Sequence, residues 1–126
     1  MNKPLPRILV VDDEKDIVDF LSVELARRDF EVDTALSGEE AIEKIKANRP
    51  HLMLLDIRMP GMGGIEALRR AKEIDPRIGV IMVTAVHDEE TAKRAVSLGA
   101  HDYITKPIDF NYLNLVVMTK IIDMLG

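Results

Sequence analysis

Cysteine is absent from this sequence, and a long hydrophobic run is missing from its start. Without cysteine the chain can form neither a disulfide framework nor a thiol-based active site. The opening residues, MNKPLPRILVV, lack the apolar core of a signal peptide, and the charged residues are spread too evenly for a membrane span. We therefore expect a cytoplasmic protein that does not interact with membranes.

Positive charge is also scarce. The chain has 17 Lys and Arg against 22 Asp and Glu, a formal net charge of -5. A general nucleic-acid surface needs clustered Lys and Arg, so this balance argues against a nucleic acid as a direct ligand. The rest of the composition, with 47% hydrophobic residues in a chain of 126, is typical of one globular domain, which we expect to span residues 1–126.

Short aliphatic and β-branched runs alternate with longer amphipathic stretches along the chain. The predicted strands are residues 8–11, 31–35, 52–55, 79–83 and 102–105. Such alternation predicts parallel strands joined by crossover helices. We expect an α/β fold with five helices and a doubly wound five-stranded sheet, in the flavodoxin-like strand order 2-1-3-4-5.

Helical spacing fills the gaps between the predicted strands. Ile17, Leu21 and Leu25 recur at the interval of one helix face, and Ser37 with Glu40 has the spacing of a capping box. The last two helices are expected to begin near residues 88 and 109. The segment 57–64, which is rich in glycine and directly follows a strand, is the irregular connection and a candidate functional loop.

Polar side chains gather at one end of the predicted sheet. The residues at or just past the carboxyl ends of the strands are Asp12, Asp13, Asp56, Thr84 and Lys106. The second strand contributes none, and in the expected order it lies away from the third, fourth and fifth strands. The polar groups should therefore form one contiguous site at the switch point of the sheet.

Each of these residues has an ordinary alternative role. Asp12 or Asp13 can be the N-cap of the first helix, which by itself is the favoured interpretation. Asp56 can be a solvated acid, Thr84 a β-branched strand residue and Lys106 an exposed turn lysine. These separate roles do not explain why carboxylates, a hydroxyl and an ammonium converge on one edge of one sheet.

Clustered carboxylates repel one another and need either raised pKa values or a cation. Carboxylate and carbonyl oxygens are ligands that Mg²⁺ prefers, with waters or a substrate phosphate completing its coordination. An aspartate carboxylate is also a competent nucleophile toward phosphorus. Transfer of a phosphoryl group then needs mainly alignment and charge neutralisation, which Mg²⁺, Lys106 and the Thr84 hydroxyl can supply.

Four segments resemble one known family, the receiver domains of bacterial response regulators. They are ILVVDDE, LLDIRMPGMGG, IMVTA and GAHDYITKP, and the resemblance covers essentially the whole chain. It implies that Asp56 is the phosphate acceptor. It also implies that Asp13, Asp56 and the backbone carbonyl of Arg58 bind Mg²⁺ directly, with Asp12 acting largely through water.

The same resemblance assigns a switch. Lys106 and Thr84 would contact the phosphoryl group, the Lys106–Pro107 bond would be cis, and Tyr103 would be the aromatic residue that turns inward. From the residues alone, Tyr103 is more simply a strand aromatic with a solvated hydroxyl. In the family, the residues at the positions of Arg58 and Val86 modulate how readily water reaches the phosphoryl group; from the residues alone they are equally a surface arginine and an apolar loop residue.

The resemblance also implies partners and an output. The phosphoryl donor would be a sensor histidine kinase or a phosphotransfer protein. The fourth helix, fifth strand and fifth helix would change their surface and control an output domain or a target protein. The chain would not be an enzyme beyond its own phosphorylation and dephosphorylation.

The last helix has more apolar residues than one core face requires. Its inward stripe is Phe110, Leu113, Val117, Ile121 and Met124. A second stripe consists of Leu115, Met118, Ile122 and Leu125. This second stripe is either partly buried within the domain or a surface for a homodimer.

The histidines show no spacing typical of metal ligands. His51 is expected at the amino end of the third strand, opposite the site, and His87 and His101 in loops. We interpret all of them as surface or turn residues.

The sequence motifs argue against other functions. A haloacid-dehalogenase-like phosphohydrolase would carry DxDx[TV] after the first strand, whereas this chain reads DDEKD there. A nucleotide- or flavin-binding module would need GxGxxG after the first strand or GK[ST] in the glycine-rich loop, and neither is present. A receiver that binds partners without phosphorylation is disfavoured because every site position has the family's residue type.

Overall fold

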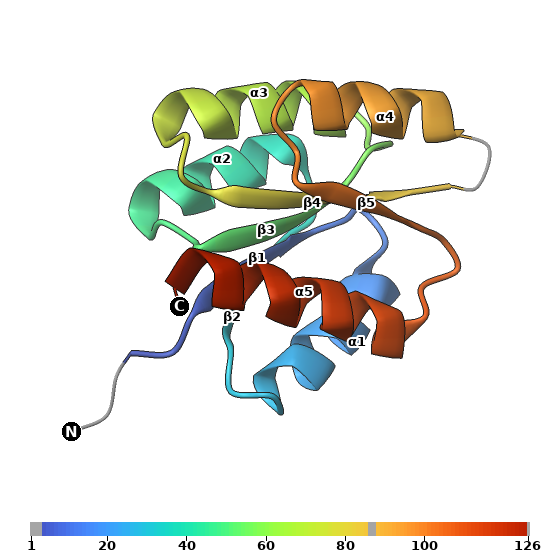
Figure 1. The fold of residues 1–126 in the computed structure, drawn as a ribbon. Coiled ribbons are helices and arrows are strands. Elements are labelled where there is room, and N and C mark those ends of the chain that lie inside the picture. The colour runs from blue at the N-terminus through green and yellow to red at the C-terminus, as the bar shows by residue number, and fades with distance from the viewer. Residues whose placement is uncertain (1–3, 86–87, 126) are drawn as a thin grey trace.

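The computed structural model describes residues 4–85 and 88–125, which form one parallel sheet covered by helices on both faces (Figure 1). The strands are β1 (Arg7–Val11), β2 (Glu31–Ala35), β3 (Leu52–Asp56), β4 (Gly79–Thr84) and β5 (Asp102–Thr105). The helices are α1 (Lys15–Ala26), α2 (Gly38–Ala47), α3 (Gly64–Ile74), α4 (Glu89–Ser97) and α5 (Phe110–Leu125). The strand order β2-β1-β3-β4-β5 confirms the predicted fold class.

Two hydrophobic clusters pack against the two faces of the sheet. One cluster joins alternate strand residues such as Leu9 and Met53 to α2, α3 and α4. The other joins the intervening residues, such as Ile8 and Leu54, to α1 and α5. Both faces are therefore buried, which explains why the central strands read as continuous apolar runs.

Local sequence signals set most helix boundaries. Ser37 caps α2 by accepting the Glu40 N–H at 3.0 Å, while Glu40 accepts the Leu36 N–H at 2.6 Å, one residue before the N-cap. In α1 the buried positions are Val18, Leu21 and Leu25, and Ile17 packs half-buried against the same cluster, so the predicted helix face is confirmed.

The carboxyl ends of the strands are level with one another. The register pairs nearest these ends are Val11–Leu55, Asp56–Val83 and Thr84–Thr105. Residues that follow β1, β3 and β5 are therefore neighbours in space although they are distant in the sequence. This register brings the predicted site residues to one edge.

The two apolar stripes of α5 differ in exposure. Leu113, Val117 and Ile121 are buried against the sheet, whereas Leu115 and Ile122 are 62% and 63% exposed. A homodimer through this second stripe stays a prediction. Among the described residues, no helix is both long enough and apolar enough to cross a bilayer.

Candidate functional site

Asp12, Asp13 and Asp56 meet at the carboxyl edge of the sheet. One carboxylate oxygen from each of these aspartates lies within 4.8 Å of the corresponding oxygens of the other two. Asp12 and Asp56 are buried, and Asp13 is exposed. Neither Asp12 nor Asp13 is the N-cap of α1, because that position is occupied by Glu14, whose N–H Asp12 accepts at 2.9 Å.

Lys106 places its ammonium among these carboxylates. Its Nζ lies 3.2 Å from Asp12 Oδ2 and 3.6 Å from Asp56 Oδ2. It also donates to Glu14 Oε1 at 3.0 Å. Burial alone would lower the pKa of Lys106, but Glu14, Asp56 and Asp12 outweigh it and raise that pKa to about 12. Lys106 is therefore a permanent cation at this edge.

One ammonium does not compensate the buried acids. Burial and the neighbouring charge of Asp12 raise the pKa of Asp56 to about 6, although Lys106 and the backbone N–H of Arg58 act in the opposite direction. Burial also raises the pKa of Asp12. An added cation would remove this repulsion.

The donor set at this edge fits a hard divalent metal ion. Carboxylate oxygens, which Mg²⁺ prefers, converge beside a cleft of about 420 Å³ that Asp13, Asp56 and Lys106 help to line. The cleft is open, so water or a phosphoryl group can complete the coordination. The acidic cluster therefore suits the Mg²⁺ ion that the sequence predicts.

Among the described residues, the side chains of Thr84 and Tyr103 form no hydrogen bond with the acidic cluster. Thr84 is fully buried at the end of β4, and its hydroxyl donates to the Ala85 carbonyl at 3.2 Å. Tyr103 is half-buried and packs against the hydrophobic cluster beneath α2, α3 and α4. The Lys106–Pro107 bond is cis, as expected.

Arg58 turns its side chain toward the start of α4. Its Nη2 donates to Asp88 Oδ1 at 2.7 Å, and its Nε donates to Asp88 Oδ2. This pair ties the loop after β3 to the loop after β4, across the acidic edge. Val86, the other predicted modulator, and His87 lie outside the described residues.

Sequence reasoning missed Glu14 and Asp88. Glu14 directly follows the acidic pair, and that adjacency was the available signal, but its contact joins residues 92 positions apart. The sequence predicts a helix that begins near Asp88, and no local pattern indicates that Asp88 pairs with Arg58.

Gly64 brings the loop after β3 close to the end of the strand. Its N–H donates to the Ile57 carbonyl at 2.8 Å. A Cβ at this position would lie 2.2 Å from the backbone oxygen of Asp56, which no side chain can tolerate. The glycine is therefore required by the tight turn that follows Asp56.

Comparison with known proteins gives the same result from sequence and from structure. The profile of the family described as "Response regulator receiver domain" matches residues 8–118. The chain is 42% identical over 111 residues to the regulatory protein AtoC of Escherichia coli (strain K12), covering 88% of this chain and 24% of that protein. It is 42% identical over 106 residues to the chemotaxis protein CheY of Treponema pallidum (strain Nichols), covering 82% and 74%.

Solved structures agree with these matches. A CheY-like response regulator receiver domain protein from Methanospirillum hungatei JF-1 superposes with a TM-score of 0.91 at 33% identity, covering 95% of this chain and 96% of that one. NtrX from Brucella abortus, in complex with ADP, gives 0.91 at 34% identity, covering 95% and 28%. The chain spans about half or less of the first curated relatives that it matches.

Proposed function

Because this chain belongs to the response regulator receiver domain family, we propose that it accepts a phosphoryl group on Asp56 from a sensor histidine kinase or a phosphotransfer protein. The family consists of signalling domains rather than classical enzymes. The observation that carries the proposal is the convergence of Asp12, Asp13 and Asp56 within 4.8 Å, with Lys106 beside them. That residues 1–126 make up one receiver domain is part of the proposal, as is the cytoplasmic location.

Asp56 is the nucleophile in this proposal. A carboxylate oxygen of Asp56 forms a bond to phosphorus while the bond from phosphorus to the donor's histidine nitrogen breaks, and that nitrogen keeps the electron pair. The Lys106 ammonium lies 3.6 Å from Asp56, so it can approach the oxygens of the phosphoryl group. Transfer requires little else from the protein than alignment and positive charge.

Asp13, Asp56 and the Arg58 carbonyl would hold Mg²⁺ directly, and Asp12 would hold it through water. Bound there, the ion would neutralise the carboxylates and the phosphoryl oxygens. The raised pKa of Asp56 supports this assignment, because burial and the Asp12 charge disfavour its ionised form and a bound cation would favour that form.

The output would follow from the added charge. A phosphoryl group brings about two negative charges, and the Thr84 hydroxyl would leave the Ala85 carbonyl to bond with it. Tyr103 would then turn inward, changing the surface of α4, β5 and α5 that an output domain or target protein contacts. The longer relatives are consistent with an output domain, since this chain matches part of their length.

The test is phosphorylation by a small acyl phosphate. The native chain, incubated with acetyl phosphate and Mg²⁺, should gain one phosphate by intact mass. Hydroxylamine should remove this adduct, and EDTA should prevent its formation. Asp56→Asn should gain none, while Asp123→Asn, which removes an exposed carboxylate on α5, should behave like the native chain. A native chain that stays unmodified would instead indicate a receiver that acts without phosphorylation.

A further inference from the structure

A second pocket lies at the opposite edge of the sheet, where the strands begin. It has a volume of about 410 Å³, and the charged residues that line it are Arg7, Arg49, Arg77 and Asp75. His51, which directly precedes β3, also lines it. The length of β3 separates this pocket from Asp56, so it is not part of the acidic site.

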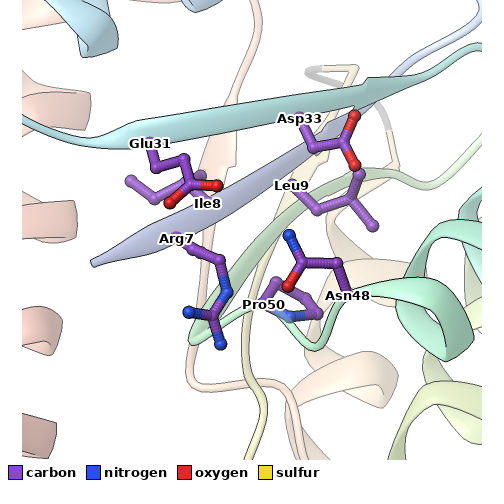
Figure 2. A pocket seen from close by; sticks show the side chains of 7 residues that line it. All are labelled: Arg7, Ile8, Leu9, Glu31, Asp33, Asn48 and Pro50. Carbon is purple, nitrogen blue, oxygen red and sulfur yellow. The ribbon is translucent and has the colours of Figure 1, made fainter. Parts of the chain in front are cut away.

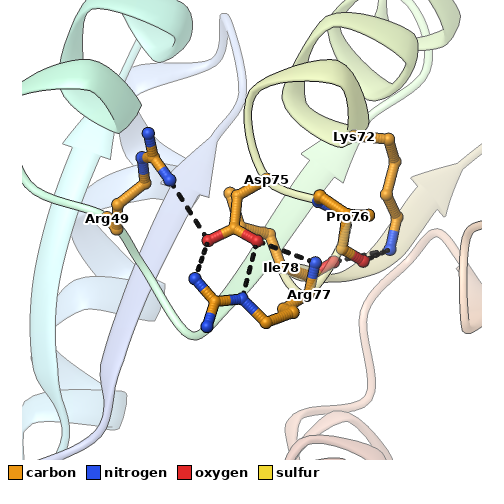
Figure 3. Close-up of polar contacts among 6 residues, drawn as sticks. All are labelled: Arg49, Lys72, Asp75, Pro76, Arg77 and Ile78. Carbon is orange, nitrogen blue, oxygen red and sulfur yellow. Dashed lines mark hydrogen bonds and ion pairs between the residues drawn. The ribbon is translucent and has the colours of Figure 1, made fainter.

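Asp75 organises two of the arginines (Figure 3). It accepts from Arg77 through the backbone N–H at 3.0 Å, Nε at 3.0 Å and Nη2 at 3.1 Å. It also accepts from Arg49 Nη1 at 3.2 Å. These contacts with Arg77, followed by those with Arg49, lower the pKa of Asp75 to about 2. One carboxylate thus orients two guanidinium groups.

Arg7 adds a third guanidinium group to this edge. Its side chain extends from β1 past Pro50 (Figure 2), and its Nε donates to the Arg49 carbonyl at 2.8 Å. Among residues 4–85 and 88–125, no carboxylate lies within ion-pair distance of it. Its charge is therefore not neutralised by a direct ion pair, and the nearby carboxylates of Glu31 and Asp33 line a smaller adjoining pocket with it (Figure 2).

His51 contributes a neutral donor. Its Nδ1 accepts the Arg7 backbone N–H at 2.9 Å, so the neutral ring carries its proton on Nε2. Burial, together with the Arg7 charge, lowers the pKa of His51 and keeps the ring neutral. The pocket thus combines guanidinium donors with an imidazole N–H.

We propose that this pocket binds a small dianionic ligand, which is either a phosphate ester or a dicarboxylate. Guanidinium groups match such oxyanions with paired hydrogen bonds. The volume lies in the range of small-molecule sites, which is larger than a single ion requires. Ile78, Met124 and Leu125 form an apolar wall that suits the uncharged part of the ligand.

Helix dipoles explain only part of this arrangement. α2, α3 and α5 end at this edge, and cations near helix C-termini are stabilising without any ligand. That effect accounts for basic residues near this edge. It does not explain why Arg7, Arg49 and Arg77 line the same pocket, with Asp75 as the carboxylate in its lining.

The test is an NMR titration of the Mg²⁺-free chain in EDTA and at constant ionic strength. The probes are inorganic phosphate, phenyl phosphate and succinate, and the signals followed are the Arg7 amide and the His51 ring. We expect saturable shifts, with phenyl phosphate binding more tightly than inorganic phosphate because of the apolar wall. Comparison with succinate separates a phosphate ester from a dicarboxylate.

Variants decide whether the arginines are responsible. Arg7→Gln and Arg49→Gln should each weaken binding about tenfold, since each removes charge-assisted hydrogen bonds. Arg69→Gln, which removes an exposed charge on α3 away from the pocket, should leave the affinity unchanged. Thermal unfolding without ligand checks that each variant is folded.

Several outcomes would overturn the proposal. One is the absence of saturation at Arg7 and His51 up to about 10 mM, well above the range of specific binding. Another is equal ligand affinity in Arg7→Gln, Arg49→Gln and the native chain. That result would mean that the arginines only stabilise the helix C-termini. Repeating the titration with Asp56→Asn separates this pocket from the proposed phosphorylation, because its affinity should not change.

Discussion

The two edges of the sheet carry opposite charge arrangements. At the carboxyl edge, Asp12, Glu14 and Asp56 surround Lys106, and the pKa of Asp56 is raised to about 6. At the amino edge, arginines surround Asp75, and its pKa is lowered to about 2. The same residue type therefore has opposite pKa shifts at the two ends of one sheet, because burial and the Asp12 charge dominate at Asp56, whereas hydrogen bonds from Arg77 dominate at Asp75.

Strand direction makes this segregation possible. In a parallel β/α sheet, helices begin near the carboxyl edge and end near the amino edge, so their dipoles favour anions at one edge and cations at the other. A chain with a net charge of -5 can in this way still present a positive surface. Net charge consequently says little about either site.

The largest expected effect comes from removing the cation of the carboxyl edge. Lys106→Met should slow phosphorylation by acetyl phosphate about 100-fold, the usual loss when a group that stabilises developing charge is removed. The rate of adduct formation by intact mass measures this. Lys93→Met, an exposed lysine of α4, is the matched control. Equal rates for the native chain and Lys106→Met would contradict the role given to this ammonium.

A change of shape without a change of charge tests how closely this edge is packed. Gly64→Ala should lower the free energy of unfolding by about 2–3 kcal/mol, because its Cβ would overlap the Asp56 carbonyl. Gly63→Ala, whose Cβ would meet its nearest atom at 3.7 Å, should cost less than about 1 kcal/mol. Urea unfolding measures both. Similar losses in the two variants would mean that the turn can relax.

Neutralising Asp56 should stabilise the metal-free protein. Asp56→Asn removes a buried charge, and we expect a gain of about 1–2 kcal/mol at pH 7 after allowance for solvent screening. Since the folded pKa is raised to about 6, the gain should be largest above that pH and vanish below pH ~4, the unfolded value. Urea unfolding in EDTA across this range measures it. An Asn variant that is less stable at pH 7 would contradict the assigned repulsion.

The smallest effect is expected at the amino edge. Because the pKa of Asp75 is lowered to about 2, its ion pairs should stabilise the fold above pH ~4 and lose this contribution as the pH falls toward 2. Asp75→Asn should lower the melting temperature by about 5 °C at pH 7 and converge with the native chain in acid. Asp123→Asn controls for the loss of one negative charge. A pH-independent difference would indicate packing rather than charge.

Much of the fold could be predicted because its signals are local. The predicted strands agree with the observed ones to within one residue at each end, since short strand-forming runs alternate with longer amphipathic segments along the chain. The acidic edge could be predicted from the strand order 2-1-3-4-5, because residues that follow parallel strands lie at the same edge of the sheet. The inward face of α1 could be predicted from the spacing of Ile17, Leu21 and Leu25, although the spacing did not indicate that Val18 is buried more fully than Ile17.

Contacts between side chains could not be predicted in the same way. Arg58 pairs with Asp88, 30 residues away, and Arg49 pairs with Asp75, 26 residues away. Neither pair has a spacing that a helix or strand imposes, and each depends on how two loops meet. The basic pocket was missed for this reason, although its arginines are plain in the sequence.

The sequence by itself determined the strands, the helices and the edge at which the acids gather, because hydrophobic periodicity is local and a helix between successive strands makes those strands parallel. The tertiary structure decided which carboxylates lie close enough to raise one another's pKa, where Arg58 points, and that arginines from β1 and from two loops line one pocket. Those outcomes depend on distances between residues far apart in the chain, which packing sets.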